Sequence, residues 1–544
     1  MRSLRITLRA LRNPGLRRAL LPFVLFSIAE WATWIALLVW AYDLRGVGGA
    51  ATVSVVQLLP AILAAPLGSV LGDRMPRGRA LAVGYTLQGA SMLGTAAALA
   101  TEQPFAVVCT GGVLVTCAIT LTRPVHHAAL PDISRNPEEL TAGNAATTTG
   151  EAAGAFLGPL SSGLLIAPGG PESVFGLFGL LLLCGAAVVV GLPVPAEARL
   201  HDHEGFVRSA VAGARELRRE PSGAVLLGLV TGQFVVVGTM DILIIVLALE
   251  ALGTDSSGPG LLASAFGIGS IAGALATVVL VGRRSLSGAV AVGLLVAGLP
   301  IVVLSQAGTV LVAMLLLGVW GAGHAFFDVA GRTLLQRTVN DRVLARVFGL
   351  QEAVMTAAIA AGAALAPAAV TGLGLDGALA VTGLLLPVAG LFAWRVLRRL
   401  DSRARPPGPH FDTLRDLPFF LVAPVPVVEH LSRRTAEVVV GPGQTVVREG
   451  EPGDRFYVVL SGTVAVSRGG RPVGHMGAGT AFGETALLRE MPRTATVTTV
   501  EETRLAVLGR HDFLAALGAS PVSRESADAV AARYLDADGS GSRP

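Results

Sequence analysis

Long apolar runs recur through the first 400 residues, each bounded by a few polar or glycine-rich positions. About 20 consecutive apolar residues are the length that crosses a bilayer as a helix. We therefore predict an α-helical membrane protein with twelve transmembrane helices in two pseudo-repeated six-helix halves. The approximate ranges are 19–42, 51–72, 79–100, 104–123, 143–167, 173–193, 223–249, 259–281, 286–305, 309–331, 347–371 and 377–398.

The composition agrees with a membrane protein. Charged residues make up 15% of the chain, there are 67 glycines, and the mean hydropathy is +0.64. The first apolar run is longer than that of a cleaved signal peptide, so we interpret it as a retained helix. Cys109, Cys117 and Cys184 lie in apolar runs without metal-ligand spacing, so they predict no metal site.

Every basic residue is an arginine, and their placement predicts the orientation. A Walker-type phosphate loop requires a lysine, so the sequence excludes an ATP-driven pump built on that motif. The charge is spread too evenly to predict a nucleic-acid partner. Arginines gather in alternate loops, which by the positive-inside rule predicts a multi-pass protein of the plasma (inner) membrane with both termini in the cytoplasm. These arginines are Arg74, Arg77, Arg79, Arg135, Arg208, Arg215, Arg218, Arg219, Arg283, Arg284, Arg337, Arg342 and Arg346.

The segments between and after the apolar runs have distinct patterns. The cytoplasmic loop 194–222 separates the halves 1–193 and 223–400, and 204–220 predicts an amphipathic helix on the membrane surface. Residues 401–411 are proline-rich, which predicts a stiff linker. From about 436, short valine-rich runs are broken by turn pairs, which predicts a soluble β-roll or jelly roll within 412–535. We expect flanking helices at about 412–434 and 510–517, and a disordered tail at 536–544.

Two short stretches carry the chemistry of this last domain: 482–488 (FGETALL) and 492–497 (PRTATV). Gly483 allows close approach of the backbone to an anion, and successive N–H groups at a short helical turn can hold a phosphate. Arg493 offers a planar fork to phosphate oxygens, and Glu484 can accept hydrogen bonds from a ribose hydroxyl.

These stretches resemble the phosphate-binding cassette of cyclic-nucleotide-binding domains. The resemblance implies that Glu484 holds the ribose, Arg493 the cyclic phosphate, and Thr494 the phosphate or the base. It leaves cAMP and cGMP open, and it assigns Ser523–Leu535 as a lid. The implied nucleotide-binding set is Phe482, Gly483, Glu484, Thr485, Ala486, Arg493, Thr494 and Ala495.

Residues 1–400 resemble the major facilitator superfamily, with two sets of six spans and a basic central loop. The loop between the second and third spans, 71–79 (LGDRMPRGR), is similar to that family's conserved loop. Its matching positions are Leu71, Asp73, Arg74 and Arg77, whereas Ser69, Pro76 and Gly78 depart from it. The resemblance implies that Asp73, Arg74 and Arg77 form a conformational charge cluster that pairs across the two halves.

The fifth span carries small residues at 154, 158–159 and 162–163 that resemble the antiporter signature of proton-coupled exporters. Helix packing alone would also explain small residues and a proline at this spacing. The pattern favours export. Glycines 267, 269 and 273 miss the dinucleotide-binding spacing and are interpreted as packing residues.

Ionisable groups at membrane depth are costly and are therefore functional candidates. Glu30 lies midway along the first span and Asp241 midway along the seventh, so we expect both to face a central cavity. We hypothesise that they carry protons or bind a cationic substrate; the alternative is a buried, neutral carboxyl. Arg123, at the end of the fourth span, and Asp328, near His324 in the tenth, are weaker transport candidates that also fit a loop ion pair.

Together these patterns predict a secondary active transporter, a proton-coupled exporter of a small molecule, regulated by cAMP or cGMP in its cytoplasmic domain. No nucleophile–base or metal constellation predicts an enzyme. One alternative is a carrier whose β-roll serves assembly or partner binding. A cyclic-nucleotide-gated channel fits less well, because the halves are duplicated and no filter loop is recognisable. The transported substrate is left open.

Overall fold

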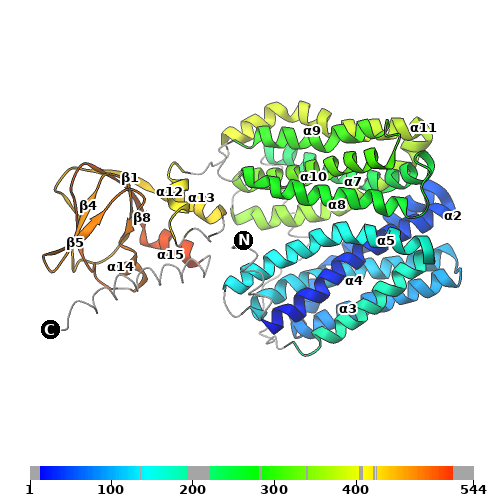
Figure 1. The fold of residues 1–544 in the computed structure, drawn as a ribbon, viewed down its shortest axis with the longest axis horizontal. Coiled ribbons are helices and arrows are strands. Elements are labelled where there is room, and N and C mark those ends of the chain that lie inside the picture. The colour runs from blue at the N-terminus through cyan, green and yellow to red at the C-terminus, as the bar shows by residue number, and fades with distance from the viewer. Residues whose placement is uncertain are drawn as a thin grey trace. The chain divides into compact units, whose positions relative to one another are not determined.

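The computed structural model divides the chain near residue 404 into two compact units. Long helices make up the first unit, and strands with short helices make up the second (Figure 1). The residues described are 13–134, 137–192, 221–280, 285–338, 341–403, 408–418, 420, 423, 425–489 and 491–518.

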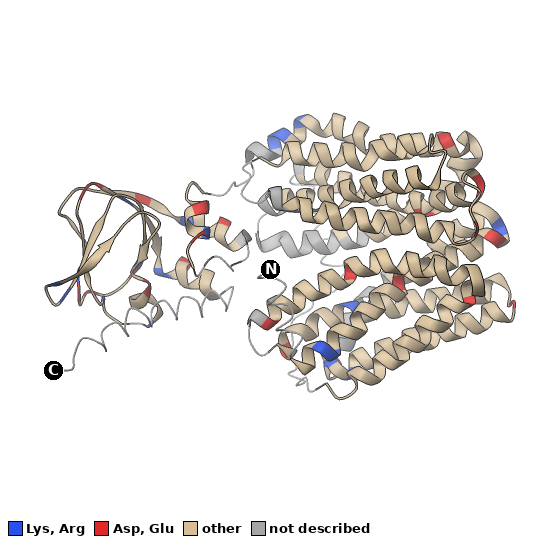
Figure 2. Cartoon of the chain, viewed as in Figure 1, with Lys and Arg blue, Asp and Glu red and all other residues tan. Residues whose placement is uncertain are grey.

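In the described part of the first unit, eight helices are long and apolar enough to cross a membrane. Charged residues are sparse along these helices (Figure 2). The helical elements are α2 (Pro14–Arg74), α3 (Arg77–Ala100), α4 (Phe105–Ile133), α5 (Pro137–Val189), α7 (Pro221–Val246), the π-helical turn η1 (Leu247–Ala251), α8 (Gly258–Ala276), the 3₁₀ turn η2 (Thr277–Leu280), α9 (Ser287–Leu304), α10 (Val310–Thr338) and α11 (Asp341–Arg403).

Helix α2 is a hairpin of two arms. Its backbone leaves the helical conformation at Arg45 and Gly46, where Gly46 has φ +62°. A Cβ on Gly112 of α4 would meet Leu37 and Gln57 within 3.2 Å, so these two residues of α2 lie close together. In a straight helix they would be about 30 Å apart, at 1.5 Å per residue. The chain therefore reverses at Gly46.

Helices α5 and α11 break in the same way, at Gly170 (φ +66°) and Gly374 (φ +68°). Ser173 donates a hydrogen bond to the carbonyl of Leu165 at 3.0 Å, although a straight helix would hold the two about 12 Å apart. The two arms of α11 lie against neighbouring turns of α7, one at Gly232 and one at Gly238. All three reversals fall in the gaps predicted between spans, at 43–50, 168–172 and 372–376; the count of twelve crossings stays a prediction.

The two halves of the helical unit share a core and approach closely. The buried cluster around Phe23 and Tyr85 also takes in Ile242 of α7 and Ala363 of α11. Gly260 of α8 lies against the backbone of α5 at Gly163, and Gly267 of α8 lies against it at Ala155. Small residues at these positions allow backbone contact that a side chain would prevent. The interpretation of Gly267 as a packing residue is confirmed.

Some predicted boundaries are wrong. Helix α4 continues to Ile133, past the predicted end at 123, because one of its faces stays buried there through Val125, His126, Ala129 and Leu130. Helix α11 runs to Arg403, three residues into the predicted linker. The predicted surface helix 204–220, the lid Ser523–Leu535 and the tail 536–544 lie outside the described residues.

The second unit is a β-roll of two four-stranded antiparallel sheets, as predicted. Their strand orders are β1-β8-β3-β6 and β2-β7-β4-β5. The strands are β1 (Ala436–Val440), β2 (Thr445–Val447), β3 (Arg455–Ser461), β4 (Val464–Arg468), β5 (Arg471–Met476), β6 (Ala481–Phe482), β7 (Thr496–Thr499) and β8 (Thr503–Gly509). The helices are α12 (Phe411–Arg415), α13 (Val425–Arg434), α14 (Glu484–Leu488) and α15 (Arg510–Gly518).

Strand β3 connects two separate cores in this unit. Successive side chains of a strand point to opposite faces. Phe456 stacks on Phe513 of α15, with ring centroids 4.4 Å apart, in the core under the helices. Its neighbour Tyr457 stacks on Phe482 of β6 at 5.0 Å, in the core between the sheets. These contacts fix β6, and with it the start of the predicted cassette.

Candidate functional site

Gly483 joins β6 to α14 and has the backbone that only glycine adopts easily. Its φ is +93°, and it caps the five-residue helix that begins at Glu484. A Cβ here would lie 2.6 Å from the Arg493 guanidinium and 3.1 Å from the Arg455 carbonyl. Both the conformation and the lack of space therefore require glycine.

Arg493 is buried beside this turn, with 5% of its side chain exposed. It donates hydrogen bonds to the carbonyls of Gly483 at 3.0 Å and Arg455 at 2.7 Å. Its guanidinium carbon lies 5.8 Å from the centre of the Tyr457 ring, and the carboxylate of Asp454 is 3.7 Å away. Burial lowers the pKa of Arg493, although a guanidinium stays charged in proteins. The structure thus holds a buried, oriented cation.

Glu484 is buried next to this cation, with 3% of its side chain exposed. One carboxylate oxygen accepts a hydrogen bond from the Thr485 hydroxyl at 3.3 Å. The other, Oε2, has no partner among the described residues. Burial raises the pKa of Glu484 above its ordinary value of 4.5. A buried acceptor without a donor is costly, so this oxygen can bind a hydroxyl group of a ligand.

The remaining predicted nucleotide-binding residues surround these two. Phe482, Thr485 and Ala486 are buried, whereas Thr494 and Ala495 are half-buried. Arg468 of β4 donates a hydrogen bond to the Thr494 carbonyl at 2.8 Å. The backbone of Arg493 exchanges hydrogen bonds with the turn at Gly450 and Glu451, at 2.9 and 2.8 Å. The segment after α14 is therefore fixed from both sides.

The helical unit contains a cavity of about 280 Å³ with Glu30 and Asp241 on its wall. Five helical elements contribute to it: α2, α4, α5, α7 and α11. Its other lining residues are Trp31, Thr33, Trp34, Gln57, Leu58, Ala61, Val115, Thr116, Ile119, Thr120, Phe175, Val237, Thr356 and Ile359. The structure thus brings together the two carboxylates that the sequence singled out in the first and seventh spans.

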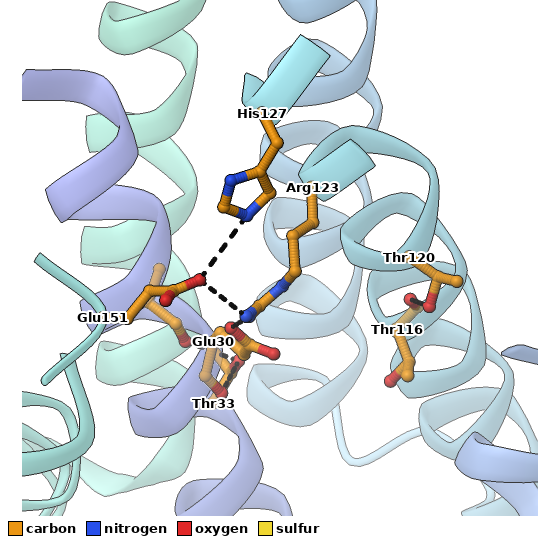
Figure 3. Close-up of polar contacts among 8 residues, drawn as sticks. Glu30, Thr33, Thr116, Thr120, Arg123, His127 and Glu151 are labelled. Carbon is orange, nitrogen blue, oxygen red and sulfur yellow. Dashed lines mark hydrogen bonds and ion pairs between the residues drawn. The ribbon is translucent and has the colours of Figure 1, made fainter. Parts of the chain in front are cut away.

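Glu30 belongs to an ion-pair network of three helices (Figure 3). Arg123 of α4 binds Glu30 of α2 through Nη2 and Glu151 of α5 through Nη1, the latter at 3.1 Å. His127, one turn further along α4, lies 3.7 Å from the same Glu151 oxygen. The interpretation of Arg123 as a residue at the end of a span is wrong, because α4 continues for ten residues beyond it.

Sequence reasoning missed Glu151 and His127. Glu151 lies inside the apolar run 143–167, so it carries the same indicator of function as Glu30, a carboxylate at membrane depth. His127 lies beyond the predicted end of the fourth span and could have been found only with the true length of α4.

Asp241 has a different environment. The indole N–H of Trp34 donates to its Oδ2 at 3.3 Å. Within the described part of the chain, no arginine or histidine pairs with it. Trp34 lies on α2 and Asp241 on α7, so this hydrogen bond joins the two halves of the helical unit. Trp34 was another residue that the sequence gave no reason to single out.

Asp328 does not join this cavity. It pairs with Arg332 within α10 at 2.9 Å, the spacing of one helical turn. The neighbouring His324 contacts Gln233 of α7, with the nitrogens 2.6 Å apart. Asp328 thus forms an ion pair, as one alternative allowed, but the pair lies within a helix and not in a loop.

The predicted charge cluster between α2 and α3 is described in part. Arg77 pairs with Asp132 of α4 at 2.5 Å and donates to the carbonyl of Ala128. Both partners lie in the same half as Arg77, and the pairing of the cluster across the halves stays a prediction. Asp73 and Arg74 close α2, and their side chains lie outside the described residues.

Comparison with known proteins identifies both parts of the chain. The family profile of the Major Facilitator Superfamily matches residues 20–244 and 229–443. The chain belongs to the Major Facilitator Superfamily. The profile of the cyclic nucleotide-binding domain matches residues 437–520 of this superfamily member, which confirms the resemblance of the C-terminal part to that domain. The Major Facilitator protein is thus fused to a cyclic nucleotide-binding domain.

Relatives of this superfamily member match its C-terminal domain. The cGMP-dependent protein kinase egl-4 of Caenorhabditis briggsae is 49% identical over 71 residues, 13% of this chain and 10% of the kinase. The cAMP-dependent protein kinase regulatory subunit of Yarrowia lipolytica is 45% identical over 82 residues, 15% of this chain and 22% of the subunit. The solved catabolite activator protein of Thermus thermophilus is 32% identical, covering 22% of this chain and 60% of that one, with a TM-score of 0.21. This chain thus spans less than a quarter of either kinase protein.

Proposed function

We propose that this protein is a secondary active transporter that exports a small molecule in exchange for protons and is regulated by a cyclic nucleotide. One observation carries the proposal. A single chain holds a membrane cavity with two carboxylates and, in a separate unit, a buried arginine beside a carboxylate oxygen that lacks a donor. The first arrangement suits transport, and the second suits a phosphate ester of a ribose.

We further propose that the helical unit crosses the inner membrane twelve times, with both termini in the cytoplasm. The hairpins α2, α5 and α11 supply two arms each. Helices α3, α4, α7, α8, α9 and α10 supply one each. The alternating arginines support the orientation, which would expose the C-terminal domain to the compartment where cyclic nucleotides are made.

Exchange against protons is supported by the chemistry of the cavity. A carboxylate at membrane depth is stabilised by a cation or by protonation. Glu30 has Arg123 as its partner, and Asp241 has the neutral indole of Trp34. A change of conformation that separates Arg123 from Glu30 would favour proton uptake. Export is favoured by the small residues of α5, where Gly158 lies against Trp31 on the cavity wall.

Regulation by a nucleotide is supported by the state of Arg493 and Glu484. Arg493 is already positioned, and Glu484 Oε2 lacks a donor among the described residues. Relatives of this domain are named for cAMP and for cGMP, so we propose both as ligands to test. Thr494 is the position at which the two bases could be distinguished.

Transport can be tested in proteoliposomes that contain the full chain and a trapped pH-sensitive dye. We expect members of a panel of small organic cations, anions and neutral compounds to drive proton movement, at a rate that cAMP or cGMP changes. Glu30→Gln and Asp241→Asn should abolish the proton movement, while Asp376→Asn, at an exposed position of α11, should not. Proton coupling that survives in both cavity variants would contradict the assignment of the exchange to these two carboxylates. A nucleotide without effect on binding or rate would favour the β-roll as an assembly module.

A further inference from the structure

Asp241 is the carboxylate of the membrane cavity that has no basic partner in the described structure. Glu30 and Glu151 share Arg123, and Glu151 also lies near His127. The single hydrogen bond described for Asp241 comes from the Trp34 indole N–H to Oδ2, at 3.3 Å, and it uses one acceptor position of that oxygen. A carboxylate can accept about four hydrogen bonds, so Asp241 keeps most of its capacity for a ligand.

The wall around Asp241 is suited to an aromatic or apolar body. Trp31, Trp34 and Phe175 line the cavity together with aliphatic side chains. Indole and phenyl rings attract cations through their negative faces, and tryptophan does so most strongly. The cavity volume of about 280 Å³ lies near the lower limit of small-molecule sites, which hold roughly 300–1,000 Å³. The ligand is therefore compact, with one or two rings.

The hydrogen-bonding groups of the wall add to this selectivity. Thr116 donates its hydroxyl to the Gln57 side-chain oxygen at 3.1 Å and Thr33 donates to the Ala29 carbonyl, so both are engaged within the protein. Arg123, which pairs with Glu30 of this wall, is engaged by two carboxylates. An anionic ligand would meet Asp241 and Glu30 without a free cation among the described residues.

From this arrangement we propose that the transported substrate is a compact organic monocation with an aromatic ring, whose charge is bound by Asp241 between Trp34 and Trp31. This inference rests on the proposed transport function and names its substrate class. It also divides the roles of the two carboxylates. Asp241 binds the substrate charge, and Glu30 is reserved for the Arg123 network.

Three probes with the same two-ring body test the charge requirement. N-methyl-4-phenylpyridinium is a monocation, 4-phenylpyridine is neutral at pH 8, and biphenyl-4-carboxylate is an anion. Equilibrium binding to the purified full chain is followed by tryptophan fluorescence and by radiolabelled ligand. We expect the cation to bind at least about tenfold more tightly than the other two, from the charge-assisted contact with Asp241. Equal or tighter binding of the neutral or anionic probe would overturn the proposal.

Variants locate the site. Asp241→Asn should weaken cation binding about 10- to 100-fold, while Asp241→Glu, which keeps the charge, should recover most of it. Trp34→Ala should weaken binding by more than Trp34→Phe, because phenylalanine retains an aromatic face. Asp376→Asn removes an exposed carboxylate of α11 and is the matched control, with wild-type affinity expected. Wild-type affinity in Asp241→Asn would also overturn the proposal.

The result separates this inference from the proposed function. If the cation fails to bind while another compound of the panel drives proton movement, the substrate class is wrong and the exchanger stands. If the cation binds through Asp241 but never moves protons in proteoliposomes, the substrate site stands and proton exchange is contradicted.

Discussion

Arg493 is held in its binding orientation before any ligand arrives. Two backbone carbonyls, of Gly483 and Arg455, fix its guanidinium, and Tyr457 lies beside it. A side chain that is already oriented loses little conformational entropy on binding, so its contacts contribute more to affinity. The N–H groups of the Arg493 guanidinium that do not bind these carbonyls are available for a phosphate.

Replacing Arg493 should therefore cost more than the loss of a charge. We expect Arg493→Ala to weaken binding of cAMP or cGMP by about 100-fold or more, through loss of charge-assisted hydrogen bonds. Arg493→Lys should recover little of this, because an ammonium group cannot reproduce the planar fork. Isothermal titration calorimetry on the full chain measures the affinity. Arg504→Ala, which breaks an exposed ion pair with Glu437 on the same β-roll, is the control and should bind normally.

The buried carboxyl of Glu484 leads us to predict that nucleotide binding releases protons. Burial raises its pKa in the free domain, so its contribution to stability is present below 4.5 and is lost as the pH rises through the raised value. A ribose hydroxyl that donates to the carboxylate favours the ionised form and lowers the pKa in the complex. At a pH between the pKa of Glu484 in the complex and its pKa in the free domain, the wild type should release a fraction of a proton for each nucleotide bound. Calorimetry in two buffers of different ionisation enthalpy measures it.

Glu484→Gln is the matched variant, since an amide of similar shape does not titrate. Its binding heat should be the same in both buffers across this pH window, and its affinity should be lower. Buffer-independent heats in the wild type would show that Glu484 stays ionised in the free domain and would contradict the prediction.

At the scale of residues, the sequence predicted the functional residues that lie within one short stretch of the chain. Gly483, Glu484 and Arg493 are close in sequence, so one short stretch could carry the resemblance to a cassette that binds phosphate. Trp34 was missed because its role depends on a partner far along the chain, Asp241, whereas Glu151 lies inside an apolar run and could have been singled out as Glu30 was. A periodic pattern shows which residues are apolar but not which side chains meet across three helices.

At the scale of elements, one glycine in each hairpin determines where the chain turns. Gly46, Gly170 and Gly374 combine a φ of +62° to +68° with an extended ψ, a region open to glycine and strained for other residues. The gaps in the apolar pattern located all three turns. The sequence did not predict that the helix would continue up to each turn, because polar residues of the predicted gaps, such as Asp43, extend the helical arms.

Gly374 allows a clean test of this strain. No atom lies within 4 Å of a Cβ built there, so Gly374→Ala changes backbone conformation without a clash. We expect a loss of about 1–3 kcal/mol in the free energy of unfolding. Gly372→Ala, two residues earlier, also meets open space and has no positive φ, so it should be neutral or slightly stabilising. Thermal unfolding of the purified chain compares the two; equal midpoints would show that the turn adapts without strain.

At the scale of the whole molecule, the chain joins two units of different construction. The helical unit places half-buried carboxylates on the wall of a cavity, and the β-roll buries an arginine and a glutamate. The change from long apolar runs to short valine-rich runs after residue 400 was enough to predict this division. Coupling between the units could not be predicted, because it depends on the difference in free energy between two conformations rather than on either sequence pattern.

Regulation by a nucleotide implies a reciprocal effect that binding experiments can measure. If cAMP or cGMP changes the affinity for N-methyl-4-phenylpyridinium by some factor, the cation must change the nucleotide affinity by the same factor, because both ligands act on one equilibrium. We expect a factor of roughly 5–150, typical of coupled sites. Titrating each ligand with and without a saturating amount of the other measures both factors. In Arg493→Ala the nucleotide concentration needed for the effect should rise in proportion to its lost affinity. Two ligands that bind independently, with both factors equal to one, would show that the nucleotide does not act on the substrate site.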